Sequence, residues 1–435
     1  MQPQWLHFFM IICSMKSHIL ILVLCFPMVL AAQNSTLLQN ALRNYDYEKA
    51  LILLSKERRS AEVDFQKARC LRNLNRYDEA IDLLLPLSKD ENSTVAVVIE
   101  LAQCYEAVGN LRQAAFFYRM GLDDAPANRF LQLKYLNLKF QLREWDETIR
   151  LGRSILATDT VAGVLPLLAD CYMQINNTDS AGILYKQSIQ KFPADYTTVM
   201  KLARLCVNAN KTEQLVQVTG NYLQLDSANA GGNLYNGIGY FMKKEYPRAL
   251  SRIGKAYGLG DKTFLTNYYM GATYLALQEY GDAYQYLSKA FVQDSSNINL
   301  HYYLSKAGIY SGNSQKVMGI LHRAVDELMP GDTVMFNYHY LLSEGYARLF
   351  NYPMQINELN QCYRYKPDFK YALYCIASIY DTRLRKPEEA VAYYIQYLAK
   401  AGKPKTNDLQ SGLSCATAAE NRLKEIQEEL KKKVR

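Results

Sequence analysis

The chain has 435 residues, two to three times the ~150 residues of a typical domain, so its length predicts several domains or one extended array of repeats. Hydrophobic residues make up 49% and charged residues 21%, which excludes a mainly disordered or fibrous chain. The net charge of +8 is too small and too evenly spread to indicate a partner that is a nucleic acid.

Residues 1–32 have the pattern of a secretory signal peptide. An apolar run over residues 19–32 follows Lys16 and His18, and it ends in small residues before the polar Gln33. This run is shorter than the ~20 residues that a membrane-spanning helix needs. We therefore expect cleavage after Ala32 and export of the chain.

Alternatives remain open for this leader. Translation from Met15 would give a more ordinary leader, so Met15 is a second candidate for the true start. The leader could also be an uncleaved anchor over residues 5–32, although Lys16 in its middle would be costly inside a bilayer. A lipid anchor is not expected, because the large Leu24 precedes Cys25, where a lipoprotein signal has a small residue.

A period of 34 residues recurs along the rest of the chain. Residues 237–256 match residues 271–290 at an offset of 34, and residues 68–84 match residues 102–118 in the same way. The first match pairs Gly237 with Gly271, Tyr240 with Tyr274, Tyr246 with Tyr280, Ala249 with Ala283 and Ala256 with Ala290. Two distant parts of the chain therefore share one repeating unit.

The spacing within a unit predicts two antiparallel helices. Small residues at the eighth and twentieth positions let the two helices approach closely, and bulky side chains fill the gap to the next pair. One pair cannot bury its apolar face alone, so the units must stack. Pro126, Pro193 and Pro367 end the second helix of their units.

This order of small and aromatic residues resembles the tetratricopeptide repeat, whose pattern is G-x2-Y, then A-x3-F, then P. The resemblance implies an all-α solenoid, a right-handed superhelix of about ten to eleven antiparallel helix pairs over residues 33–403. Residues 404–435 are expected to form a linker and a polar capping helix. The clearest copies are Gly271, Tyr274, Tyr280, Ala283, Leu287 and Ala290; Ala102, Tyr105, Ala114, Tyr118 and Pro126; and Ala169, Tyr172, Ala181, Tyr185 and Pro193.

Three units depart from the pattern. The unit around Thr148 is weak, and the unit that contains Leu215 lacks the alanine of its second helix. The unit after Asn299 has Gly319 at that place and needs two extra residues upstream. A hinge near residue 300 is therefore one expectation for this part of the chain.

Residues that catalyse reactions or bind metals are sparse after the leader. His301, His322 and His339 come from three different predicted helices and show no metal-ligand spacing. The chain also has no C-x-x-C pair, glycine-rich phosphate loop or G-x-S-x-G motif. We therefore expect no enzymatic activity, no cofactor and no metal site.

Seven cysteines follow the leader, an odd number that would leave one thiol over in a disulfide framework. Cys70, Cys104 and Cys171 share the tenth position of their units. Stacked helices lie ~10 Å apart, which is too far for a disulfide between equivalent positions. These thiols are therefore predicted to be small buried core residues.

The resemblance implies that the fifth position of each first helix faces the inner, concave surface. The subfamily that grips acidic chaperone tails places lysine and asparagine on this surface, and this chain departs from it. Every residue of the series is apolar or aromatic: Phe65, Ile99, Leu133, Pro166, Met200, Leu234, Tyr268, Leu304, Tyr340 and Tyr374.

Further apolar residues surround this series between Leu234 and Leu304. A groove with an apolar middle suits a segment of another protein, whereas a tight superhelix would instead pack these residues on one another. The candidate partner-binding residues are Leu234, Ile238, Phe241, Met242, Leu265, Tyr268, Leu275, Leu304, Tyr340 and Tyr374.

Four triplets resemble the O-glycosylation acceptor of some Gram-negative exported proteins. They would place sugars on Thr160, Ser180, Ser227 and Thr333. Helix capping alone would also explain Asp followed by Ser or Thr at these places. The basic residues 431–435 offer the only expected membrane contact, and they could equally be a solvated helix end.

Together these patterns predict a non-enzymatic scaffold in the periplasm, or on the periplasmic face of the envelope, that binds a protein or peptide on its concave face. The partner class comes from the family resemblance. The alternative is a glycan-binding protein of the cell envelope, because tyrosine-rich surfaces also stack on sugars.

Overall fold

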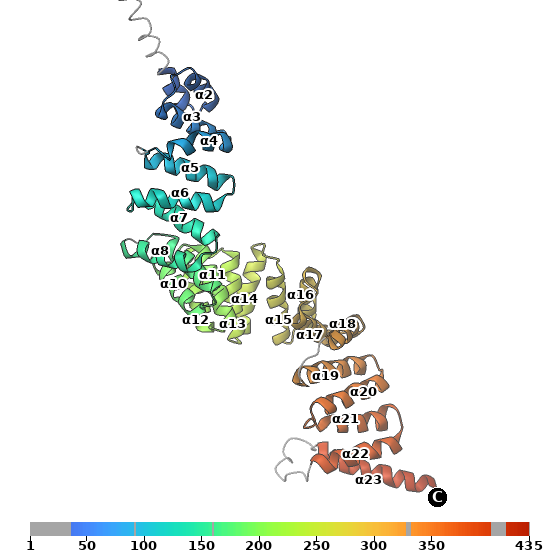
Figure 1. The fold of residues 1–435 in the computed structure, drawn as a ribbon. Coiled ribbons are helices and arrows are strands. Elements are labelled where there is room, and N and C mark those ends of the chain that lie inside the picture. Colours follow the sequence, from blue (N-terminus) through green and yellow to red (C-terminus); the bar gives the residue numbers. More distant parts are fainter. Residues whose placement is uncertain (1–35, 91–92, 159–160, 328–331, 402–414, 435) are drawn as a thin grey trace, which may run out of the picture. The chain divides into compact units, whose positions relative to one another are not determined.

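The computed structural model describes residues 36–90, 93–158, 161–327, 332–401 and 415–434 (Figure 1). Throughout these residues the regular secondary structure is helical, with no strand. The predicted all-α solenoid of tetratricopeptide type is confirmed, because helix pairs follow one another at the predicted period. The predicted leader and residues 402–414, which include the start of the predicted linker, lie outside the described part.

The helices pair along the chain as first and second helices, and successive helices pack on one another within residues 47–191 and within residues 196–434. After α2 (Tyr47–Ser55), the pairs are α3 (Ala61–Asn73) with α4 (Tyr77–Leu87), α5 (Val95–Ala107) with α6 (Leu111–Asp124), α7 (Arg129–Gln141) with α8 (Trp145–Thr158), α9 (Val164–Gln174) with α10 (Thr178–Lys191), α11 (Tyr196–Asn208) with α12 (Thr212–Leu225), α13 (Ala230–Met242) with α14 (Tyr246–Gly258), α15 (Phe264–Ala276) with α16 (Tyr280–Gln293), α17 (Ile298–Tyr310) with α18 (Ser314–Glu327), α19 (Asp332–Arg348) with α20 (Tyr352–Tyr365), and α21 (Tyr371–Ser378) with α22 (Pro387–Ala401).

Contacts divide the chain into two units, which are described separately. Unit 1 runs to Phe192 and holds α2 to α10, and unit 2 begins at Pro193 and holds α11 onward. The division falls at these residues and not near residue 300, where α17 packs against both α16 and α19.

Close helix approach depends on the small residues, as the repeat predicts. A Cβ at Gly237 would lie 2.5 Å from Ile253 Cγ1, and a Cβ at Gly271 would lie 2.5 Å from Leu287 Cγ. Ala249 is fully buried beside the first of these contacts. A larger residue at either glycine would push the two helices of its pair apart.

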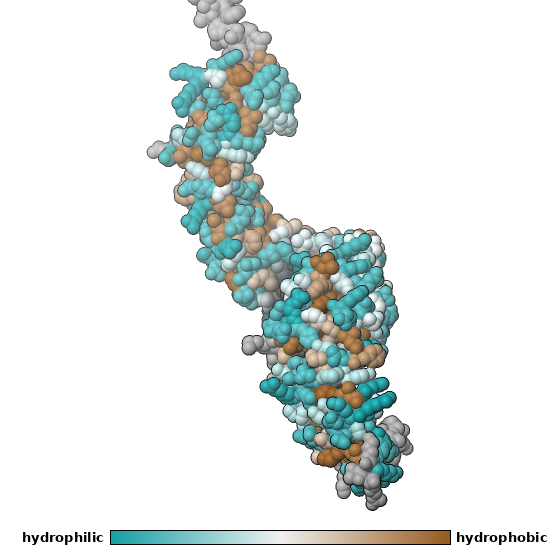
Figure 2. All heavy atoms as spheres, turned by 90° about the vertical axis from the view of Figure 1, so that its right-hand side faces the viewer, coloured by the Kyte–Doolittle hydropathy of each residue, from teal (hydrophilic) through white to brown (hydrophobic). Residues whose placement is uncertain are grey.

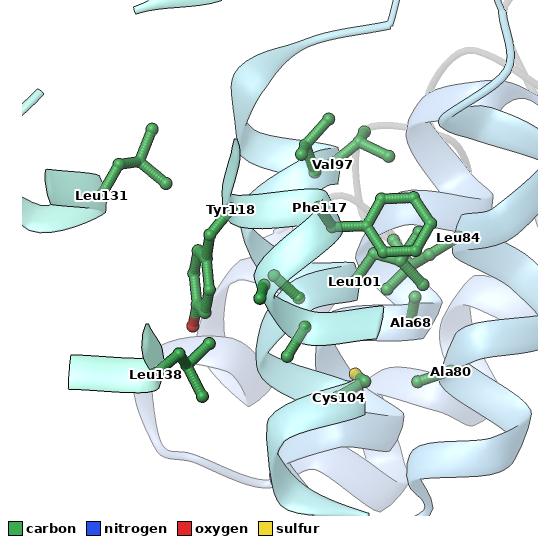
Figure 3. Close-up of a cluster of buried hydrophobic side chains, with 14 of the residues drawn as sticks. Ala68, Ala80, Leu84, Val97, Leu101, Cys104, Phe117, Tyr118, Leu131 and Leu138 are labelled. Carbon is green, nitrogen blue, oxygen red and sulfur yellow. The ribbon is translucent and has the colours of Figure 1, made fainter. Parts of the chain in front are cut away.

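The core of unit 1 shows how the bulky positions interlock between pairs. Leu84 of α4, Leu101 of α5 and Phe117 of α6 gather between their helices (Figure 3). The predicted core thiols belong to the interior: Cys70, Cys104 and Cys171 are buried and free. Burial raises the pKa of Cys104 to about 11 and that of Cys171 to about 12, so both stay protonated.

The predicted insertion before α17 is wrong. Helices α17 and α18 begin at Ile298 and Ser314, each one repeat length after the start of α15 or α16. The extra residues lie instead in α19, which has 17 residues against 13 in α17. Val317 takes the place of the repeat's second-helix alanine, and Gly308 opposite makes room, since its Cβ would lie 2.5 Å from Val317 Cγ1.

The other two weak units also form regular pairs. Leu215 takes the alanine position in α12 and is fully buried. Gly239 on α13 accommodates the larger side chain, because a Cβ there would lie 3.3 Å from Leu215 Cγ and closer still to Val216. Thr148 in α8 is fully buried, and its hydroxyl donates a hydrogen bond of 2.8 Å to the Glu144 carbonyl.

Helix α23 (Cys415–Val434) packs on α22 at the end of unit 2. Arg422 of α23 forms two hydrogen bonds, of 2.8 and 2.9 Å, to the carboxylate of Asp381. Asp381 is buried in the short π-helix η1 (Ile379–Arg383) that continues α21. In the residues that the structure describes, no helix combines the length and apolar character needed to cross a membrane.

Candidate functional site: the inner face of α11 to α19

The first helices α11, α13, α15, α17 and α19 contact one another in turn and form one face of unit 2. We call this the inner face. The partner-binding candidates from the sequence lie on these helices, except Tyr374, which lies on α21.

Four of the ten candidates belong to the protein's own core. Leu234, Ile238, Leu275 and Leu304 are 4%, 1%, 9% and 2% exposed. Neighbouring helices cover these side chains, which is the tight-packing alternative that the sequence left open. They offer no surface to a partner.

The other six candidates are half-buried and keep part of their surface in solvent. They are Phe241, Met242, Leu265, Tyr268, Tyr340 and Tyr374. The helix bounds also correct the fifth-position series, because Tyr302 and not Leu304 lies one repeat length after Tyr268.

Sequence reasoning missed three tyrosines beside these positions. Tyr235, Tyr269 and Tyr303 occupy the sixth residue of α13, α15 and α17, and all three are half-buried. Their spacing of one repeat length was a visible signal. Together with the rings next to them they form the tyrosine cluster, which comprises Tyr235, Phe241, Phe264, Tyr268, Tyr269, Tyr302 and Tyr303.

Rings of this cluster join successive first helices. Tyr268 stacks on Phe264 at 5.8 Å between ring centroids and meets Tyr303 of α17 at 5.9 Å. Tyr269 meets Phe241 of α13 edge to face at 5.4 Å. Such contacts add ~0.5–1.5 kcal/mol per pair beyond the burial of apolar area.

The hydroxyl groups of the cluster remain available for hydrogen bonds. Tyr235 accepts a bond of 3.0 Å from Arg204 Nε. In the described part of the chain, the hydroxyls of Tyr268, Tyr269 and Tyr303 form no hydrogen bond with the protein. Burial, and then the neighbouring Tyr303, raise the pKa of Tyr268 and of Tyr269, so both stay neutral donors at physiological pH.

The charged side chains on the first helices α11, α13, α15 and α17 are all positive. Helices α11, α13, α15 and α17 contain no Asp or Glu, whereas α11 carries Lys201 and Arg204 and α17 carries Lys306. Among the described residues Lys306 is half-buried and forms no ion pair. Further along this face, α19 carries Glu344 in its last turns, with Arg348 following it.

A second group of rings lies further along unit 2 and contains the candidates Tyr340 and Tyr374. Tyr340 stacks on Phe336 at 6.1 Å and meets Phe369 edge to face at 5.8 Å. Tyr374 stacks on Tyr371 at 5.8 Å. These two candidates therefore belong to a different ring group from Tyr268.

Histidines do not come together in a site. His301 Nε2 lies 2.6 Å from the Ser295 carbonyl oxygen, and His322 Nε2 lies 2.7 Å from the Tyr346 hydroxyl. His339 Nδ1 lies 2.6 Å from Glu358, where both side chains are buried. In the part of the chain described, His, Cys, Asp and Glu nowhere form a group of three that could hold a metal ion.

The glycosylation candidates differ in their surroundings. Thr160 lies outside the described residues. Ser180 is half-buried as the third residue of α10, and its N–H binds Asn177, which is the actual N-cap. Ser227 is exposed in the turn before α13, and Thr333 is exposed in the first turn of α19.

The remaining surface is mixed in character. On the face in view in Figure 2, hydrophobic side chains reach the surface in small groups that hydrophilic side chains separate. Lys431 and Lys432 of the basic tail are exposed at the end of α23.

Comparisons with known proteins find a similarity of fold. No family model and no curated protein matches the chain. One solved structure with a similar fold is a chain of the APC/C hetero-tetramer Cut9–Hcn1. Its sequence identity to this chain is 15% and the TM-score is 0.37; the match covers 90% of this chain and 88% of that one.

Two further structures are similar at the same level. YrrB, described as a tetratricopeptide-repeat protein with an unusual peptide-binding site, is 20% identical with a TM-score of 0.39, covering 44% of this chain and 96% of its own. Yeast Tom70 is 13% identical with a TM-score of 0.33, covering 92% and 96%. The likeness concerns the fold alone, and the regularly recurring helix pairs give this chain the fold of a tetratricopeptide-repeat solenoid.

Proposed function

We propose that the protein is an exported, non-enzymatic scaffold that binds a segment of another protein along the inner face of α11 to α19. The observation that carries this proposal is the tyrosine cluster. Its rings are half-buried and keep part of their surface in solvent, and the hydroxyls of Tyr268, Tyr269 and Tyr303 have no partner among the described residues.

Such a surface suits a polypeptide for two reasons. Tyrosine rings offer flat apolar area for side chains at low entropic cost, and their hydroxyls can donate to main-chain carbonyls. The rings also recur once per repeat, so an extended or helical segment would meet similar contacts along its length.

Charge narrows the kind of segment. Lys306 is half-buried and forms no ion pair with a described residue, and four successive first helices carry no carboxylate. A segment with acidic side chains between apolar ones would therefore be favoured over a basic one, because like charges facing each other across an interface are costly.

Export is part of the same proposal and rests on the leader pattern of residues 1–32. A periplasmic chain of this kind would act by holding partners and not by chemistry. Fractionation of cells that express the full chain, with mass analysis of its N-terminus, tests cleavage after Ala32.

A photo-crosslinking amino acid tests the binding face directly. Placed at Tyr303 in the full chain in cells, a benzophenone side chain should form adducts with a partner. Placed at Gln285, which is exposed on the second helix α16, it should not. Equal adducts at both positions, or none at Tyr303, would remove the inner face as the binding surface.

The glycan-binding alternative predicts a different adduct at the same position. Tyrosine rings with free hydroxyls can stack on sugars as well as on peptides. Peptides of a second protein that protease releases from the adduct support the protein partner. A mass gain on the adduct that glycosidases remove supports the glycan.

A further inference from the structure

A second candidate site lies in unit 1. Residues of helices α8, α9 and α10 line a hollow of about 390 Å³ that opens to solvent. Its walls are mainly apolar, with Leu156 from α8, Leu168 from α9 and Leu184 from α10. A volume of this size is within the range of small-molecule pockets.

The polar groups of this hollow include a bonded pair, Arg153 and Tyr172. Arg153 Nη2 donates a hydrogen bond of 2.5 Å to the Tyr172 hydroxyl, and the guanidinium lies 5.9 Å from the Tyr172 ring centroid. Tyr172 is 8% exposed and therefore fixed in place. Because it accepts from Arg153, its own O–H can donate elsewhere, as can the other N–H groups of Arg153 and the hydroxyl of Ser180.

The neighbouring repeat contains an equivalent hollow with a different charge. It has a volume of about 290 Å³ and is lined by Arg119 and Leu122 of α6, which lie one repeat length before Arg153 and Leu156. Arg119 Nε donates to Asp123 at 3.0 Å, so a carboxylate of the protein already neutralises this guanidinium.

At the position of Asp123, the next repeat has Ala157, which lines the larger hollow. Among the described residues Arg153 therefore has no carboxylate partner, and no acidic side chain lines the hollow. The larger hollow combines apolar walls with one uncompensated positive charge, and this combination matches a carboxylate attached to an apolar group.

We infer that the hollow between α8, α9 and α10 binds a carboxylate carried by an aliphatic or aromatic group. The carboxylate would accept from Arg153 and Tyr172, and the apolar group would contact Leu156, Leu168 and Leu184. A free amphiphile and the C-terminal leucine of a polypeptide share this chemistry.

Titration calorimetry of the full chain with sodium octanoate tests the inference. We expect saturable binding that 1-octanol, which lacks the charge, does not reproduce. Arg153→Gln should weaken octanoate binding about fivefold or more. Ala157→Asp, which copies the arrangement of the preceding repeat, should weaken it to a similar extent while Leu156, Leu168 and Leu184 stay in place.

The preceding repeat supplies the matched control. Asp123→Ala frees Arg119 and should add a second, weaker octanoate site in the smaller hollow. An acetylated peptide ending in leucine, compared with the same peptide as its C-terminal amide, distinguishes the two sources. Binding of the peptide with a free carboxylate, but not of its amide or of octanoate, favours a chain end. Binding of octanoate, but not of either peptide, favours an amphiphile. No saturable binding of either probe, or unchanged octanoate affinity in both Arg153→Gln and Ala157→Asp, would overturn the inference.

Discussion

Within each unit, neighbouring first helices contact one another, but the kind of contact differs between the two units. In unit 1, Glu100 of α5 pairs with Arg69 and Arg72 of α3 at 3.3 and 2.5 Å, and Glu106 of α5 pairs with Lys134 of α7 at 3.0 Å. In unit 2, ring contacts of the tyrosine cluster join α13, α15 and α17.

The same repeat therefore links its first helices by ion pairs in unit 1 and by aromatic contacts in unit 2. The charges that link α3, α5 and α7 are satisfied within the protein, so they leave little for a partner. The rings of unit 2 hold neighbouring helices together and still expose faces and hydroxyls. We therefore expect partner binding at the rings of unit 2 rather than at the polar network of unit 1.

Alkaline pH should produce the largest difference in stability between the two units. Burial raises the pKa of Tyr302, Tyr338 and Tyr340 above the usual ~10, and that of Tyr310 to about 12. A phenol with a higher pKa in the folded chain keeps its proton there while the unfolded chain loses its own. The contribution of these phenols to stability is therefore full below pH ~10 and falls as the pH rises through the range from ~10 to the folded values.

Unit 1 also contains such groups, because burial raises the pKa of Tyr118 and Tyr185. Unit 2 holds more of them, so its helices should open first. Hydrogen exchange of α15 and α17, followed as the pH is raised and compared with α5 and α7, measures this order. Earlier opening of α5 and α7 would contradict the assignment of the aromatic contacts as the main link in unit 2.

Truncating one ring should have the next largest effect. Tyr268→Ala removes contacts with Phe264, Tyr269 and Tyr303 and should lower the local stability of α15 by ~2–3 kcal/mol. Tyr268→Phe keeps the ring and removes a hydroxyl that no described residue binds, so it should be nearly neutral. Urea unfolding of both variants, read by hydrogen exchange, checks the pair; equal losses would show that the hydroxyl is bonded.

The fold was predictable because its determinant is local and repeats. Gly237 and Gly271 lie where two helices touch, and no larger residue fits, so their spacing of 34 is visible in the sequence. The register of α17 and α18 was not predictable, because Val317 replaces the expected alanine and Gly308 compensates on the facing helix. Because the small residue and the large residue have changed places between the two facing helices, the sequence of this unit no longer matches the repeat pattern.

The candidate site was predictable only in part, for a geometric reason. The fifth and sixth positions of a first helix point about 100° apart around the helix axis, so one of them can be covered where the other is not. Leu234 is buried, whereas Tyr235 next to it is half-exposed. The Arg153 site also required structure: the 34-residue offset aligns Ala157 with Asp123 in the sequence, but only the structure shows the hollow that Arg153 lines.

Removing one carboxylate should weaken unit 1 selectively. Glu100→Gln leaves Arg69 and Arg72 without their partner and should destabilise α3 and α5 by ~1–2 kcal/mol, since Glu100 is only 12% exposed but both arginines reach solvent. Asp82→Asn removes an exposed charge from α4 and serves as the control. Thermal unfolding of the two variants should differ, and equal midpoints would show that the network contributes little.

Salt should have the smallest effect and separate the two units by its sign. The Debye length falls from ~10 Å at 0.1 M to ~3 Å at 1 M, so the pairs of Glu100 and Glu106 should weaken by a few tenths of a kcal/mol. Ring contacts between α13, α15 and α17 do not depend on ionic charge, and the acid-free helices α11 and α17 gain from screening of Arg204 and Lys306. Sodium chloride should therefore speed hydrogen exchange in α3 to α7 and slow it, or leave it unchanged, in α13 to α17. A uniform response along the chain would mean that ion pairs and rings contribute alike to both units.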